Sequence, residues 1–106
     1  MGIQANPRYF YSEYVNHMIR FYLSCPESIS LSGHSQADLS NWLAVQAIYA
    51  DLSDDDKQLV KELYGTRRPY SEAVNEYAAT HKLKVNSVWQ TVVRISNKIA
   101  RQRGLI

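Results

Sequence analysis

Apolar residues recur along this chain at intervals of three and four residues, the spacing that places them on one face of an α-helix. The clearest example is Val88, Val92, Ile95 and Ile99. The same spacing is found in segments near residues 7–24, 36–50, 54–64 and 72–80. No run of alternating apolar and polar residues is long enough to predict a paired strand. The pattern therefore predicts an all-α fold, a compact bundle of about five helices.

The first predicted helix is unusually aromatic. Asn6-Pro7 is expected to open it, because Asn caps helices and Pro fits their first position. Cys25-Pro26 is expected to end it, because the residue before a proline is disfavoured in helical geometry. Residues 26–34 are rich in Ser, with one Gly and one Pro, and are predicted to form a loop. The expected apolar stripe of this helix is Phe10, Tyr14, Met18, Phe21 and Tyr22.

The other predicted helices have recognisable end signals. Ser35 begins an S-x-x-D pattern typical of a capping box, and Ser53 precedes three aspartates that favour a helix start. Ser71 is expected to cap the short helix that follows. Gly65 is expected to end a helix in the left-handed conformation, which glycine adopts without steric cost, and Gly104 is expected to close the last helix.

Residues suited to catalysis or metal binding do not form a known motif. The aspartates 54–56 are adjacent on a predicted helix, where neighbouring side chains point about 100° apart and cannot converge on one ion. His17, His34, His81 and Cys25 lack the spacing of zinc ligands. There is no glycine-rich phosphate loop. We therefore expect neither enzymatic activity, nor a metal site, nor a cofactor.

Charge is distributed unevenly along the chain. Residues 1–50 have a net charge of −1 and residues 51–66 a net charge of −3, whereas residues 67–106 carry eight Lys or Arg and two Glu, a net charge of +6. No acidic residue follows His81. A basic C-terminal part on an otherwise near-neutral protein favours a surface that faces a polyanion. The alternative is a solvated helix face without a partner.

Residues 71–101 combine a short helix, a tight turn and a longer basic helix. A helix-turn-helix needs a small residue where the helices cross, an apolar anchor in the turn and an apolar residue facing back into the core. Ala78, Leu83 and Val88 supply these at separations of five residues. The common pattern I-A-x-x-L-G-I-S-x-x-x-V has Leu and Gly where this chain has His81 and Lys82. The turn must therefore accept a strained Lys82 or take another shape.

Residues 52–103 resemble region four of bacterial sigma factors and the phage late-gene regulators of the ArpU and RinA type. The segments that carry the resemblance are LSDDDKQLVKELYG and YSEAVNEYAATHKLKVNSVWQTVVRISNKIA. The resemblance covers about half of the chain and leaves residues 1–50, the aromatic-rich helical part, unassigned. It implies a C-terminal helix-turn-helix, a last helix in the major groove, and transcriptional regulation by a phage or prophage protein that contacts RNA polymerase.

The last predicted helix divides its outer residues between two roles in DNA binding. Amides read adenine and arginine reads guanine, and the N-terminal half of a recognition helix usually touches the bases. The expected base-reading residues are Asn86, Ser87, Trp89, Gln90 and Arg94. The expected phosphate-contacting residues are Arg67, Arg68, Lys82, Lys84, Lys98, Arg101 and Arg103. For Trp89 two interpretations stay open, contact with a thymine methyl group or cover for the core at the helix junction.

The aromatic residues of the first helix exceed what one buried stripe can hold. Aromatic residues are enriched at protein interfaces. Tyr9, Tyr11, Tyr14 and Tyr22 are therefore a candidate surface for a partner or a homodimer. The alternative is that their rings cover the core while their hydroxyls reach water.

The chain has 106 residues, a length typical of a single domain spanning residues 1–106. Its one cysteine excludes an internal disulfide, and its apolar runs are far shorter than the roughly 20 residues that span a bilayer. We therefore expect a cytoplasmic protein.

Two functions remain in view. The first is sequence-specific binding of double-stranded DNA in transcriptional regulation. The second is a protein-interaction module of helix-turn-helix shape that binds RNA polymerase or another host protein. An uninterrupted positive face formed by Arg94, Lys98 and Arg101, with Asn86 and Gln90 exposed, favours the first. Acidic side chains from the N-terminal half covering that face favour the second.

Overall fold

The protein is represented by a computed structural model that describes residues 8–25, 35–66 and 68–106, with side chains from residue 13 onward. The elements within these ranges are helices α1 (Arg8–Ser24), α2 (Gln36–Ala50), α3 (Asp54–Tyr64), α4 (Tyr70–Thr80) and α5 (Val85–Arg103). The predicted all-α class and helix number are therefore confirmed for the described part of the chain. The expected Asn6-Pro7 start and the 26–34 loop lie outside it.

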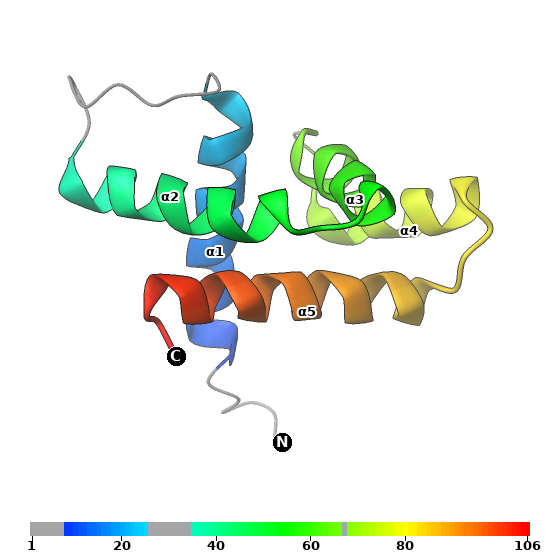
Figure 1. Cartoon of the computed structure of the whole chain (residues 1–106). Coiled ribbons are helices and arrows are strands. Elements are labelled where there is room, and N and C mark those ends of the chain that lie inside the picture. Colours follow the sequence, from blue (N-terminus) through cyan, green and yellow to red (C-terminus); the bar gives the residue numbers. More distant parts are fainter. Residues whose placement is uncertain (1–7, 26–34, 67) are drawn as a thin grey trace.

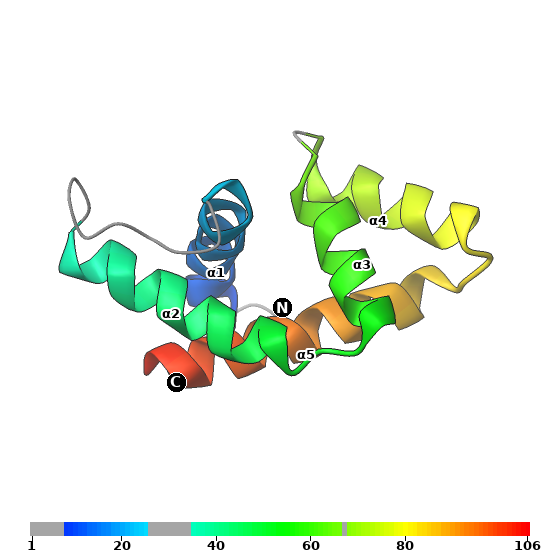
Figure 2. The same cartoon turned by 45° about the horizontal axis from the view of Figure 1, so that its top comes forward.

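Helix α5 connects two groups of helices. In Figures 1 and 2, α2 lies alongside the C-terminal half of α5 and α1 crosses both, whereas α3 and α4 lie on one side of the N-terminal half of α5. The buried apolar residues come from every helix and include Val15, Met18, Ile19, Val45, Leu63, Val74, Ala78, Ile95 and Ile99. One long helix is thus shared by both groups.

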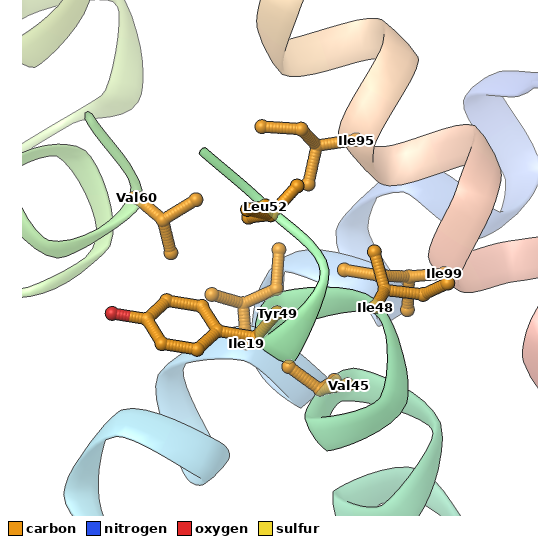
Figure 3. A pocket seen from close by; sticks show the side chains of 8 residues that line it. All are labelled: Ile19, Val45, Ile48, Tyr49, Leu52, Val60, Ile95 and Ile99. Carbon is orange, nitrogen blue, oxygen red and sulfur yellow. The ribbon is translucent and has the colours of Figure 1, made fainter. Parts of the chain in front are cut away.

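The junction between these groups is filled by apolar side chains. Ile95 and Ile99 of α5 meet side chains from α1, α2 and α3 there. Figure 3 shows the eight residues, which are Ile19, Val45, Ile48, Tyr49, Leu52, Val60, Ile95 and Ile99. They leave no space for a water molecule between them. The junction is therefore packed core and not a ligand pocket.

The buried face of α1 differs from the predicted stripe. Val15, Met18 and Ile19 are almost completely buried, whereas Tyr14 is 41% exposed. Aliphatic side chains carry no polar atom into the core, while a buried tyrosine must find a partner for its hydroxyl. The α1 core face is consequently centred on Val15, Met18 and Ile19, and the predicted place of Tyr14 in it was wrong.

Three of the predicted helix ends are confirmed. The Ser35 hydroxyl accepts the Asp38 N–H at 3.1 Å and the Asp38 carboxylate accepts the Ser35 N–H at 3.4 Å, which completes a capping box. The Ser53 hydroxyl accepts the Asp56 N–H at 3.1 Å in the same manner. Gly104 follows α5 with φ +84°, and the N–H of Leu105 donates to the Ala100 carbonyl at 2.8 Å.

At three other predicted helix ends the structure differs in detail. Gly65 ends α3 in the right-handed conformation, with φ −82°. A Cβ atom at this position would lie 2.5 Å from the Lys61 carbonyl oxygen, so glycine is needed here to avoid a steric clash and not to allow a left-handed backbone. Helix α4 starts after Pro69 and has no side-chain cap, which leaves Ser71 exposed in its first turn. Helix α5 begins at Val85, slightly before the predicted start at residue 86 or 87.

The turn between α4 and α5 accepts the strained conformation. Lys82 has φ +57°, its N–H donates to the Ala79 carbonyl at 3.3 Å, and the N–H of Leu83 donates to the Ala78 carbonyl at 2.8 Å. This pair of hydrogen bonds is a Schellman motif with lysine at the position that usually holds glycine. Ala78 and Val88 are buried as predicted, but Leu83 is 49% exposed and does not anchor the turn. Its backbone N–H, not its side chain, fixes the turn.

We expect Lys82→Gly to raise the free energy of unfolding by about 0.5–1 kcal/mol, because glycine adopts positive φ without the Cβ penalty. Lys84→Gly is the matched control, since it removes the same charge from a residue with φ −76° and gains nothing. Urea denaturation of both variants measures the difference. Equal stability of the two variants would show that Lys82 is not strained.

Candidate nucleic-acid interface

The N-terminal half of α5 exposes a polar face. Asn86, Gln90 and Val93 lie at positions i, i+4 and i+7, which puts them on one side of the helix, and all three are exposed. Among the described residues, neither amide has a hydrogen-bond partner. In both Figure 1 and Figure 2, α3 and α4 lie on one side of this half of α5. The two amide groups are therefore available to a ligand.

The other predicted base-reading residues of the first turns are also at the surface. Ser87 is exposed, and its carbonyl accepts the Thr91 hydroxyl at 3.2 Å. Trp89 is 36% exposed, so about a third of its surface is open to solvent and the rest is covered by the protein. Both interpretations of Trp89 thus keep part of their support.

Arg94 is held by a carboxylate. Its Nη2 lies 2.8 Å from Oδ2 of Asp56, in the first turn of α3, and the two side chains are 47% and 21% exposed. The positive face expected from Arg94, Lys98 and Arg101 is therefore interrupted at Arg94. The interrupting carboxylate comes from α3 and not from residues 1–50.

Four of the predicted phosphate-contacting residues lie at the two ends of the exposed face. Lys82 and Lys84 are exposed in the turn before α5, and Lys98 and Arg101 are exposed on its C-terminal half. Lys84 and Lys98 are about 21 Å apart along the helix axis, at 1.5 Å per residue. The exposed cations thus flank the polar face instead of crossing it.

Two of the remaining predicted phosphate contacts, Arg68 and Arg103, have partners within the protein. Arg68 forms a bidentate ion pair with Glu76, with Nη1 2.8 Å from Oε2, and the guanidinium holds the pKa of that carboxyl below its usual value. Arg103 is half-buried, and its Nε donates to Asn41 Oδ1 at 2.6 Å. Arg67 lies outside the described residues. The hydrogen bonds of Arg68 and Arg103 to Glu76 and Asn41 separate these two side chains from the exposed cations of the turn and α5.

The predicted aromatic surface of α1 is divided. The exposed Tyr14 accepts a hydrogen bond from Asn41 Nδ2 at 2.8 Å. Tyr22 lies against the rings of Trp42 and Tyr49, with centroids 5.2 and 5.5 Å away, and burial raises the pKa of its hydroxyl. Tyr22 thus belongs to the contact between α1 and α2. The side chains of Tyr9 and Tyr11 lie outside the described part.

Sequence reasoning assigned no role to two exposed valines of α5. Val85 and Val93 are 39% and 37% exposed and lie four residues on either side of Trp89. Four-residue spacing places the three on adjacent turns of one helix face. This spacing was the available signal, and it marks a short apolar stripe next to the two amides.

The described ranges contain neither a metal-binding cluster nor a membrane-spanning helix. No group of three His, Cys, Asp or Glu side chains there is placed to hold a metal ion. None of the described helices has the length and apolar character needed to cross a bilayer. Comparisons with protein-family models, with curated proteins and with solved structures found no match to this chain.

Proposed function

We propose that the protein is a sequence-specific regulator of transcription that binds double-stranded DNA, with α4, the turn and α5 acting as a helix-turn-helix. The observation that carries this proposal is the exposed face of the N-terminal half of α5, where Asn86 and Gln90 have no partner among the described residues. An α-helix fits the major groove of B-DNA, where amide side chains can form paired hydrogen bonds with bases.

The placement of charge supports the same proposal. Lys82 and Lys84 precede the exposed face, and Lys98 and Arg101 follow it. A helix in the major groove is bordered by phosphates, so cations at its two ends position the protein while the side chains between them read bases. The resemblance of residues 52–103 to region four of sigma factors and to phage regulators adds the expectation of a phage or prophage regulator.

A specific observation favours the second function. Leu83, Val85, Trp89 and Val93 are exposed apolar residues in and beyond the turn. Apolar side chains of this kind are common at protein interfaces. A protein-interaction module that binds RNA polymerase or another host protein through this surface is therefore the alternative proposal.

The salt dependence of binding tests the DNA proposal. With about four phosphate contacts, one for each exposed cation of the turn and α5, log K for a random-sequence duplex is expected to fall with log salt at a slope of about −3.5. Lys98→Ala and Arg101→Ala should each weaken binding to every duplex and flatten the slope by about one unit. Titration by fluorescence anisotropy at several salt concentrations measures both.

Lys61→Ala is the matched control, because Lys61 is an exposed lysine near the C-terminal end of α3. It removes one positive charge without touching α5 or the turn. A slope change equal to that of Lys98→Ala would mean that only total charge matters. A parent protein without measurable affinity at low salt would contradict the DNA proposal and favour the protein-partner function.

A further inference from the structure

The two amides on the exposed face of α5 have the chemistry of adenine readers. Asn86 and Gln90 each offer a donor and an acceptor, which match the N6 amino group and N7 of adenine in the major groove. They are about 6 Å apart along the helix axis, and each bidentate contact occupies the major-groove edge of one adenine. The two amides therefore reach different base pairs.

The apolar side chains beside the amides match the other base of the same pair. Trp89 and Val93 are 36% and 37% exposed and border Gln90 on the helix surface. The C5-methyl group of thymine is the apolar group that the major groove presents, and only A·T pairs carry it. Side chains of this kind contact thymine and gain nothing from a G·C pair.

The side chain that would read guanine is turned toward α3. Arg94 is the one arginine in the first ten residues of α5, and it pairs with Asp56 at 2.8 Å. A contact with guanine must first break this pair. It would also leave the Asp56 carboxylate, only 21% exposed, without its cation beside the DNA phosphates. Guanine reading by Arg94 is thereby disfavoured.

We infer that α5 reads A·T base pairs, through Asn86 and Gln90 on adenine and through Trp89 and Val93 on thymine methyl groups. This inference rests on the proposed function, because it names the class of duplex that the same helix face selects. In this arrangement the ion pair with Asp56 keeps Arg94 away from the bases.

Selection of bound duplexes from a random-sequence library by the full chain is the first test. The expected result is a bound core in which A·T pairs dominate. A core of G·C pairs, or tight binding without any enriched position, overturns the inference while the proposed DNA binding stands. Retention of no duplex at low salt overturns the proposed function as well.

Base analogues in the selected duplex then identify the groove that is read. In one duplex, inosine·cytosine pairs replace the A·T pairs of the selected DNA sequence. An inosine·cytosine pair presents the same major-groove edge as G·C, but its minor groove lacks the guanine amino group, as that of A·T does. The inference predicts a loss of about 5- to 150-fold per adenine contact, as for G·C itself. Replacing thymine with uracil, which lacks the methyl group, should weaken binding as well. Unchanged affinity for the inosine duplex would mean recognition of the minor groove or of DNA shape, and would overturn the inference.

Variants of the chain assign the contacts. Gln90→Ala should lose about 5- to 150-fold in affinity for the selected duplex and little for its G·C version.

Asp56→Ala should release Arg94 and reduce the ratio of affinities for A·T over G·C duplexes by about five-fold or more. Asp55→Ala is its matched control, since it removes an equal charge from the same turn of α3, and Asp55 has no pairing with Arg94. A thermal melt of each variant establishes that it is folded. If Asp56→Ala and Asp55→Ala show the same preference for A·T over G·C duplexes, the ion pair with Asp56 does not keep Arg94 from the bases.

Discussion

Ile99→Ala is expected to lower the free energy of unfolding by about 2–5 kcal/mol. Ile99 is 2% exposed and lies in the apolar junction where α5 meets side chains from α1, α2 and α3 (Figure 3). Truncation removes buried apolar atoms and leaves a cavity that the surrounding helices only partly close. Urea denaturation followed by circular dichroism measures the loss.

Ile106→Ala is the control for this variant. Ile106 is 54% exposed, so the same change of side chain should alter the stability by less than about 0.5 kcal/mol. Because α5 is shared by both groups of helices, parent and Ile99→Ala should each unfold in one transition. Two separate transitions would contradict the prediction that residues 1–106 form a single domain.

Asn41→Ala is expected to cost about 1–3 kcal/mol, because it removes two hydrogen bonds made by a side chain that is itself buried. Asn41 is 8% exposed, its Nδ2 donates to the Tyr14 hydroxyl at 2.8 Å, and its Oδ1 accepts from Arg103 Nε at 2.6 Å. One amide thereby connects α1, α2 and α5. Thermal and urea unfolding measure the effect.

Asn41→Asp separates hydrogen bonding from side-chain volume. A carboxylate of the same shape still accepts from Arg103, and Tyr14 can reverse its role and donate its hydroxyl proton. We therefore expect Asn41→Asp to retain more stability than Asn41→Ala. If both variants lose the same amount, the bonds to Tyr14 and Arg103 do not stabilise the fold.

Features governed by neighbouring residues were predictable from the sequence. The apolar spacing of Val88, Ile95 and Ile99 defines a buried helix face, and all three are buried. The caps at Ser35 and Ser53 depend on residues three positions ahead, which a sequence displays directly. For Gly65 the sequence predicted the position but not the conformation. It was correctly placed after α3, but its conformation is set by a close approach to the Lys61 carbonyl oxygen.

Features governed by distant residues were not predictable. Arg94 was expected to face DNA, but its partner Asp56 is 38 positions away in the sequence. Arg103 was expected at a phosphate, but it bonds to Asn41 from 62 positions away. Charge and spacing identify these arginines as polar surface residues. They do not reveal which arginine forms a hydrogen bond or ion pair with another part of the protein. The exposure of Asn86 and Gln90 was predicted correctly, because helix periodicity alone sets it.

The length and continuity of α5 have a mechanical consequence. Its 19 residues, about 28 Å from end to end, contain neither proline nor glycine, so the helix behaves as one rod. Its C-terminal half is packed against α1 and α2, while its N-terminal half presents Asn86 and Gln90. A small tilt of the packed end therefore displaces the opposite end of the rod, and under the proposed function that displacement would run across neighbouring base pairs.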